Sequence, residues 1–540
     1  MDANPNDPAP RSAEGLNERS ALLPRFLGSH QGAIPQYSNS YALTPLFYWI
    51  RSTSLSLLIF TLVVHFLLLI NIFISIPILS HLSTGFTPIG FTALSALLLA
   101  MQLTFVYSPN APERITQRIN AFLLVVDVLL VVLSPILRHR EGWRGIFFVF
   151  WAFLMSLWIV FSDEMLLRQY KEEHPEYASG SYEHSTWSPT TWPWRRFGNL
   201  TISMIFSIIL TVLTIHTVLT LALRAYDGNL TAPGKLYTVT DSKAKIHLEC
   251  FGSTTSPNRS TVLIEGGEVS VHPFKEWILN LHHTAGGSGE LDWDPSVVNE
   301  KVGFNYIPPD TRVCVWDRPG MGWSDNIGSP SSIGMVEDLL GEALVQADVH
   351  GPYILVGHGI GGVYSNVFAA RHLGEVKGML LIDSGSVQSL QRSGSFSTRF
   401  LLFIRGWLSP LGINRLFGTI FLGRDRKDRV YGFYSWTSDR WVKAKLEESI
   451  TGPTFSKSEL RSAQAVLPKK LPVSIITSGN SLKNVKNWSE EQRELSKLTD
   501  NTVWDIVNDA PHEVWKTSEG AKIILKRAAE LFSGRLFDGN

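Results

Sequence analysis

The sequence predicts a multi-pass α-helical transmembrane region followed by an α/β domain, whose mostly parallel sheet carries helices on both faces. Two observations support this prediction. Long apolar runs are confined to residues 54–223, whereas from Lys235 onward short β-rich runs alternate with amphipathic stretches. Strands that alternate with helices form parallel sheets buried on both sides. We therefore expect a disordered tail over residues 1–50, a membrane region over 51–226 and a globular domain over 235–540.

The N-terminal fifty residues are rich in Pro, Asn, Ser and Gly and show no sustained apolar period, which indicates disorder. They contain no apolar signal-peptide core, and their acidic residues are atypical of a mitochondrial transit peptide. Within them, the hexapeptide ERSALL at 18–23 resembles an acidic dileucine signal that sorts membrane proteins to vacuoles or lysosomes. A chance match is the alternative interpretation.

Five apolar segments are long enough to cross a bilayer, which takes roughly 20 residues. They cover approximately residues 54–79, 86–107, 119–137, 143–161 and 199–223. Asp127 lies inside the third segment, and an intramembrane carboxylate is a candidate functional group. We favour the simpler alternative, a hydrogen bond to a Ser or Thr of a neighbouring helix.

The orientation of the chain follows from five spans, which place its two ends on opposite sides of the membrane. A cytoplasmic N-terminus puts more Arg and Lys on the cytoplasmic side than on the other, although the loop Arg138-His-Arg140 opposes this rule. The C-terminal domain is then lumenal. Acceptor sequons at Asn229, Asn258 and Asn487 fit that side.

Composition restricts the kinds of partner and site. The chain has 48 Lys and Arg against 48 Asp and Glu, so its neutral net charge gives no indication of a nucleic-acid partner. Cys250 and Cys314 are its two cysteines, too few for a disulfide framework or a zinc cluster. We expect neither a metal nor a cofactor. Both cysteines fall on predicted strands, and we expect them reduced in the core, a disulfide in an oxidising lumen being the alternative.

Seven β-strands are predicted in the C-terminal domain. They cover residues 245–252, 261–267, 311–317, 353–356, 376–383, 472–477 and 502–507. The fourth of these runs directly into the glycine-rich turn GHGIGG at 357–362. A strand, a tight glycine turn and a helix in succession form the turn on which α/β-hydrolases carry their nucleophile.

The C-terminal domain resembles the α/β-hydrolase fold over residues 240–535. Three motifs carry the resemblance in the family's order: WDRPGMGWSD at 316–325, GHGIGG at 357–362 and APHEV at 510–514. The resemblance implies a mostly parallel eight-stranded sheet, in which the strands of Cys250 and Cys314 are neighbours, and a helical cap formed by residues 387–470. The membrane region is similar to that of fungal integral membrane proteins of uncharacterised function.

The family's catalytic positions can be carried over residue by residue. The nucleophile position is Gly359, which has no hydroxyl, and His512 is the general base. The segment 478–484 after the seventh strand of the family fold contains no carboxylate, so Asp383 is the expected acid. The backbone N–H groups of Gly267 and Ile360 would form the oxyanion hole. None of the nearby candidates is expected to replace the hydroxyl: Ser365, Ser384, Ser386 and His358.

Two functions follow from the vacant nucleophile position. We favour a membrane-anchored pseudoenzyme that binds a ligand or protein partner without hydrolysis. The alternative is an active lipid or ester hydrolase that uses an unrecognised nucleophile, or the Asp383–His512 pair acting on water. The apolar cap favours a lipid, an apolar or ester-like small molecule, or the bilayer surface as the partner. The expected location is an endomembrane or vacuolar membrane, with a mitochondrial membrane as the alternative.

Overall fold

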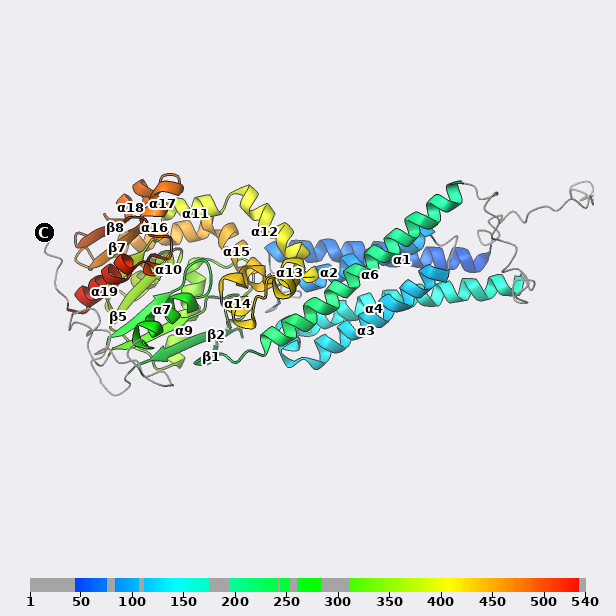
Figure 1. Ribbon diagram of the computed structural model, residues 1–540, viewed down its shortest axis with the longest axis horizontal. Helices are drawn as coiled ribbons and strands as arrows, with labels where there is room; N and C mark the ends of the chain where they lie inside the picture. Colours follow the sequence, from blue (N-terminus) through cyan, green and yellow to red (C-terminus); the bar gives the residue numbers. More distant parts are fainter. Residues whose placement is uncertain are drawn as a thin grey trace, which may run out of the picture.

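The computed structural model describes residues 44–74, 83–105, 111–173, 194–240, 243–252, 260–283 and 311–533. The predicted N-terminal tail with its dileucine motif, the last residues of the first two predicted spans and the sequon at Asn258 lie outside these ranges. The chain forms an elongated molecule, with the sheet domain at one end and a bundle of long helices at the other (Figure 1).

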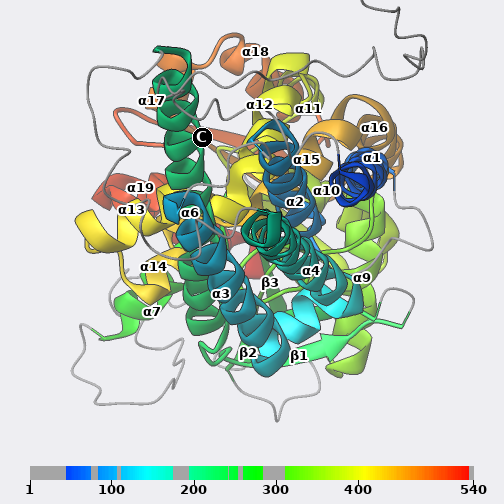
Figure 2. The same cartoon turned by 90° about the vertical axis from the view of Figure 1, so that its right-hand side faces the viewer.

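Five long helices form the bundle: α1 (Pro45–Phe73), α2 (Phe86–Phe105), α3 (Ala111–Leu133), α4 (Pro135–Glu173) and α6 (Trp194–Gly228). Each is long and apolar enough to cross a membrane, which confirms the predicted five-span region. The start of α1 lies at the end of the bundle far from the sheet, whereas α6 leads directly into the first strand (Figure 1). Viewed along the bundle, the five helices lie in front of the sheet domain (Figure 2).

The predicted loop Arg138-His-Arg140 is helical. It belongs to the first turns of α4, which begins one residue after α3 ends and bends at Gly142, whose φ is +64°. Glycine takes this left-handed conformation at little cost, so the bend needs no longer loop. The prediction of a loop was wrong because only one residue separates α3 from α4, so that residues 135–141 are already helical before the bend at Gly142.

Asp127 makes the helix–helix hydrogen bond that we favoured. It is fully buried in α3 and accepts a 2.8 Å hydrogen bond from the Thr217 hydroxyl of α6. Ser54 of α1 similarly joins three helices, since it donates to Gln102 of α2 at 3.1 Å and accepts from the Trp158 indole of α4 at 2.9 Å. These bonds satisfy polar groups that would otherwise lie bare among apolar side chains.

The C-terminal domain contains an eight-stranded sheet in the order β1-β2-β4-β3-β5-β6-β7-β8. The strands are β1 (Lys235–Thr238), β2 (Lys245–Phe251), β3 (Thr261–Glu265), β4 (Arg312–Trp316), β5 (Tyr353–His358), β6 (Val376–Ile382), β7 (Val473–Ser478) and β8 (Thr502–Val507). The pairs β1–β2 and β2–β4 are antiparallel, and all other pairs are parallel. The seven predicted strands are β2 to β8, and β1 is an additional edge strand.

The two cysteines are joined, contrary to the expectation of free thiols. Cys250 of β2 lies directly opposite Cys314 of β4 in the antiparallel pair, with their Cα atoms 4.1 Å apart, and the two form a disulfide. The family resemblance had placed both residues on neighbouring strands, so the preference for free thiols was wrong and the alternative, a cross-strand disulfide, is what the structure contains.

Helices cover both faces of the sheet. Alternate strand residues point to opposite faces: Leu263 and Leu355 pack with α9 (Ile333–Gln346) and α10 (Gly361–Arg371). Ile264 and Ile354 pack on the other face with α7 (His272–His283) and α19 (Ser518–Ser533). The short helices α17 (Gly479–Asn484) and α18 (Trp488–Leu495) follow β7.

A helical insertion separates β6 from β7. It comprises α11 (Val387–Ser393), α12 (Phe396–Leu408), η3 (Ser409–Leu411), α13 (Ile413–Phe421), α14 (Arg426–Val430), η4 (Phe433–Thr437), α15 (Asp439–Thr451), η5 (Gly452–Ser456) and α16 (Lys457–Val466). Its middle part packs against the bundle, because η3 and α12 contact α2, and α13 and α14 contact α6. Figure 1 shows α12 and α13 beside these helices, so the insertion lies between the sheet and the bundle.

Candidate active site

The turn between β5 and α10 is built by glycines. β5 ends at His358, Gly359 has a φ of +54°, and α10 begins at Gly361. A Cβ on Gly361 would come within 2.7 Å of the Glu265 carbonyl carbon, so a larger residue would push the helix away from β3. The turn therefore brings residue 359 to the carboxyl edge of the sheet, at the N-terminus of a helix, where a partial positive charge favours anions.

Asp383 and His512 meet at the same edge. Asp383 directly follows β6 and is fully buried, and its Oδ2 lies 2.6 Å from Nδ1 of His512. The other oxygen of Asp383 accepts hydrogen bonds from the Ser478 backbone N–H at 3.1 Å and from the Trp488 indole at 2.9 Å. These hydrogen bonds hold the carboxylate in a fixed orientation toward the histidine ring.

The free nitrogen of His512 faces the glycine. A Cβ built on Gly359 would lie 3.0 Å from Nε2 of His512 and 3.7 Å from the Cα of Gly267. Three segments far apart in the sequence thus converge on the position where a serine side chain would begin. The side chain of His512 is 40% exposed, whereas Gly359 is buried.

The two histidines of the site have opposite pKa shifts. Burial disfavours the charge on His512, but the hydrogen bond and negative charge of Asp383 outweigh burial and raise its pKa. Burial lowers the pKa of His358 to about 3, assisted by repulsion from His512. The two rings lie 4.3 Å apart, and Nε2 of His358 donates to the backbone carbonyl of His512 at 3.1 Å. His358 is therefore a neutral packing residue, whereas His512 is the group that carries a proton.

The loop after β3 supplies the second wall of the site. In the part of the chain that the structure describes, the backbone N–H groups of Gly267 and Ile360 donate no hydrogen bond. Arg318 holds this loop from behind, because its guanidinium donates to the carbonyl of Gly266 and, at 2.5 Å, to that of Gly267. The motif at 316–325 contained Arg318, but its contact with residues 266–267 could not be seen in the sequence.

Helix α15 fixes the same loop from the cap side. The Trp441 indole donates to the backbone carbonyl of Glu268 at 2.9 Å, and Lys445 forms an ion pair with the Glu268 side chain. Glu448 of this helix lies 3.6 Å from Arg318. The cap insertion is thus attached directly to the wall of the site.

The three serines considered as replacements for the missing nucleophile form hydrogen bonds with other groups. Ser365 donates to the Gly361 carbonyl at 3.1 Å, and Ser384 to the Gly385 carbonyl at 3.2 Å. Ser386 caps α11 and donates to Glu491 at 2.6 Å. Within the described ranges, none of the three makes a hydrogen bond to His512.

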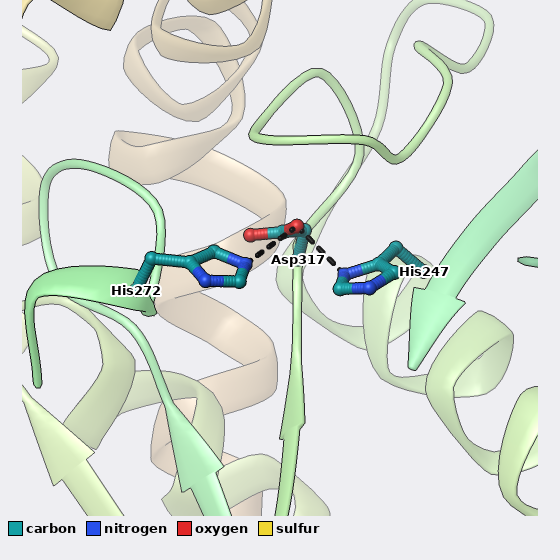
Figure 3. Close-up of side chains that lie close together, drawn as sticks. All are labelled: His247, His272 and Asp317. Atoms are coloured by element: carbon teal, nitrogen blue, oxygen red, sulfur yellow. Dashed lines mark hydrogen bonds and ion pairs between the residues drawn. The ribbon is translucent and has the colours of Figure 1, made fainter. Parts of the chain in front are cut away.

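A second cluster of ionisable residues lies beneath the loop after β4. Asp317 lies between His247 and His272, as Figure 3 shows, at 2.9 Å from Nδ1 of His247 and 3.7 Å from Nε2 of His272. All three are buried, and their ligand atoms lie within 4.8 Å of one another. Two imidazoles and a carboxylate could hold a cation such as Zn²⁺. The two histidines occur in no metal-binding motif, so they could not be identified from the sequence.

Hydrogen bonds hold His247 and Asp317 in place, whereas Nε2 of His272 is buried without a hydrogen-bond partner among the described residues. His247 directs both ring nitrogens at acceptors, Asp317 and the Pro233 carbonyl, which fits a protonated ring. Burial opposes its charge, but Asp317 raises its pKa. Asp317 also accepts from the Ser270 hydroxyl at 2.6 Å and the Trp323 backbone N–H at 3.2 Å. We therefore interpret the cluster as the anchor of the loop that carries Arg318.

Comparisons with known proteins cover both parts of the chain. A model of the alpha/beta hydrolase family matches residues 281–512, and a model of a region of unknown function, DUF2417, matches residues 18–250. An uncharacterized vacuolar membrane protein of Saccharomyces cerevisiae is 26% identical over 330 residues, which cover 53% of this chain and 49% of that protein. A structure from a study of carboxylesterases of Nitrososphaera gargenis is 16% identical and covers 56% of this chain and 100% of that chain, with a TM-score of 0.39.

Uncharacterized protein C23C11.06c of Schizosaccharomyces pombe matches almost the whole chain. It is 67% identical over 533 residues, which cover 97% of this chain and 98% of that protein. The chain therefore belongs to the family of this S. pombe protein, and its C-terminal region is an alpha/beta hydrolase domain that follows five candidate membrane helices.

Proposed function

We propose that the hydrolase domain binds a lipid or ester-like ligand at the Gly359 site and does not hydrolyse it. The observation that carries the proposal is the 3.0 Å between His512 Nε2 and a Cβ built on Gly359. This distance indicates a nucleophile turn whose base and acid are in place and whose hydroxyl is missing. In subtilisin, loss of the nucleophilic serine lowers kcat by a factor on the order of 10⁶.

The remaining groups are suited to binding. Because Asp383 raises the pKa of His512, its Nε2 carries a proton over a wider pH range than in an ordinary histidine. A protonated Nε2 donates a hydrogen bond and cannot act as a base. Together with the unused N–H groups of Gly267 and Ile360, it offers three donors to a carbonyl or carboxylate oxygen.

The cap favours an apolar ligand. Its helix α12 exposes Phe396, Phe400 and Leu401, and its neighbour α13 exposes Phe417 and Phe421. Both helices pack beside candidate membrane helices, so a ligand that resides in the bilayer has a short route to the domain.

We further propose that the domain lies in the lumen of a vacuolar or other endomembrane compartment. The sheet domain and the start of α1 lie at opposite ends of the bundle, which fits an odd number of spans (Figure 1). The Cys250–Cys314 disulfide supports an oxidising compartment, and the sequon residues Asn229 and Asn487 are exposed. The S. cerevisiae relative is a vacuolar membrane protein.

The test restores the missing hydroxyl in the full-length protein. We expect the wild type to resist a fluorophosphonate probe, which requires an activated serine. The variant Gly359→Ser should react, and His512→Ala in that background should abolish the reaction. His512 has to move by a few tenths of an ångström to admit the serine, and its exposed position allows this.

The control is Gly423→Ser. Gly423 has a φ of +59°, close to that of Gly359, and an added Cβ meets nothing within 4 Å, so it reports backbone strain alone. That strain costs about 1–3 kcal/mol. Inert Gly359→Ser protein with the stability of the control would contradict the proposed site. Ester hydrolysis by the wild type that is lost in His512→Ala would instead support the alternative, in which the Asp383–His512 pair activates water.

A further inference from the structure

A cavity separates the membrane bundle from the cap, on the bundle side of the loop after β4. It holds about 500 Å³ of space, part of it open to solvent. Its walls come from the first turns of α4, the end of α6, the loop 320–323, and the cap elements α13, α14, η4 and α15. Its polar lining comprises Arg140, Arg224, Asp227, Arg415, Arg429, Ser435, Ser438, Asp439 and Arg440.

The charge of this lining is unbalanced. Five arginines and two aspartates line it, a difference of 5 − 2 = +3. Glu141, which pairs with Arg224, and Asp325, whose charge acts on Arg140 and Arg440, reduce the difference to +1. Buried charges are costly unless an opposite charge lies nearby. The remaining positive charge therefore favours an anion in the cavity.

The ion pairs show which cations lack an anion. Asp227 accepts from Arg415 at 2.7 Å and from Arg429 at 2.6 and 2.9 Å, while Arg224 pairs with Glu141 and Asp439. Arg440 donates to the backbone carbonyls of residues 322 and 324. Among the residues that the structure describes, Arg140 makes neither a hydrogen bond nor an ion pair, and its Nε is buried.

Two further donors in the lining are unused. Nε of Arg415 and the hydroxyl of Ser435 are buried without a hydrogen-bond partner, in side chains that are only 7% and 5% exposed. Guanidinium groups match the geometry of phosphate, which accepts paired N–H donors. Arg140, which lines the cavity without a hydrogen bond or ion pair among the described residues, is therefore the donor available to an oxyanion there, and Arg415 and Ser435 line the same cavity.

The position of the cavity connects it with the bilayer. Gly412, at the start of α13, packs against Thr220, within the apolar part of α6. Arg415 on one face of α13 lines the cavity, and the opposite face presents Ile413, Phe417, Ile420 and Phe421, all more than half exposed. An amphipathic helix of this kind lies at the boundary between headgroups and acyl chains.

We propose that this cavity binds the phosphate group of an anionic phospholipid, whose acyl chains lie along α13 and α6. The site is separate from the Gly359 position. It would join the cap to the membrane region through a lipid headgroup held between Arg140 of α4 and Arg415 of α13.

The experiment measures the thermal unfolding midpoint of full-length protein in neutral detergent. Phosphatidic acid, phosphatidylcholine with the same acyl chains and inorganic phosphate are titrated separately, since a ligand of the native state raises the midpoint according to its Kd. We expect phosphatidic acid to raise the midpoint most. Arg140→Met should weaken its apparent binding about tenfold or more, which is the effect of losing charge-assisted hydrogen bonds.

Two variants make the outcome decisive. Arg461→Met removes an exposed arginine of α16 that does not line the cavity, and it should bind as the wild type does. Ser435→Asp keeps all five arginines and supplies an internal carboxylate, so it should abolish the lipid response even if Arg140→Met does not fold. An equal response of the Ser435→Asp and wild-type proteins to phosphatidic acid would overturn the site. A response to inorganic phosphate alone, lost in Arg140→Met, would overturn the lipid assignment.

Discussion

Asp227 should hold the cap to the membrane bundle. It lies in the last turn of α6, is almost completely buried, and accepts three hydrogen bonds from Arg415 of α13 and Arg429 of α14. The perturbation is Asp227→Asn, which keeps the shape of the side chain and removes its charge. Two buried guanidinium groups then lose their common counter-ion.

The magnitude follows from burial. Breaking a buried ion pair by removing one partner costs about 3–5 kcal/mol. Since about 1.4 kcal/mol corresponds to a tenfold change in an equilibrium constant, local opening of α13 and α14 should rise by roughly two to four orders of magnitude. A matched ion pair for comparison lies in the sheet domain, where Asp505 of β8 accepts hydrogen bonds from Arg527 of α19 at 2.6 and 2.9 Å. That pair is partly exposed, so Asp505→Asn should cost only about 1 kcal/mol.

Hydrogen–deuterium exchange of the full-length protein in detergent measures this opening directly. Peptides covering α13 and α14 should lose protection by at least a hundredfold in Asp227→Asn, and peptides covering β8 and α19 by only about fivefold in Asp505→Asn. Protection of α13 and α14 that falls less than tenfold would refute the reasoning. It would mean that the two arginines are held by something other than Asp227.

Three further predictions concern the site and the topology. Asp383 raises the pKa of His512, and only the neutral imidazole acts as a base. Fluorophosphonate labelling of Gly359→Ser should therefore be lost at low pH and rise through a midpoint above pH 6.5. A midpoint at or below pH 6.5 would contradict the raised pKa. The disulfide closes a loop with a sequence separation of 64 residues. Cys314→Ser should therefore lower the free energy of unfolding of the sheet domain by about 4 kcal/mol relative to the unreduced wild type, measured by denaturant unfolding. Free thiols titrated in the unreduced wild type would exclude the disulfide. Glycosidase should increase the mobility of the wild-type protein on gels, and substitution of Asn229 and Asn487 should reduce that shift, whereas an unglycosylated protein from a native membrane would argue against a lumenal domain.

Much of the architecture was determined by local sequence. A run of about twenty apolar residues is long enough to span a bilayer whatever surrounds it, so the five helices could be predicted from the sequence. Strand alternation and the glycine turn at 357–362 are likewise properties of short segments. The resemblance to the α/β-hydrolase family, and not local pattern, indicated Gly359, Asp383 and His512 as one candidate site, and the structure places the three together.

Long-range contacts could not be predicted in the same way. The contact between Arg318 and the carbonyls of residues 266–267 depends on how two loops meet. The family resemblance placed Cys250 and Cys314 on neighbouring strands, but their bonding depends on the distance between them in the folded domain. The unpaired Arg140 looked in sequence like a residue of a polar loop. It becomes a candidate ligand-binding group because the cap folds back over the end of the bundle and buries it.

The sequence by itself thus determined most of the helices and strands, because these depend on neighbours within a few residues. It also showed directly that residue 359 has no hydroxyl. Only the tertiary structure decided which charges are buried together. Arg415 and Asp227 are 188 positions apart along the chain, yet they form a 2.7 Å ion pair. The free energy of a charge depends on its burial and on its counter-ions, and both are set by segments that the fold brings into contact.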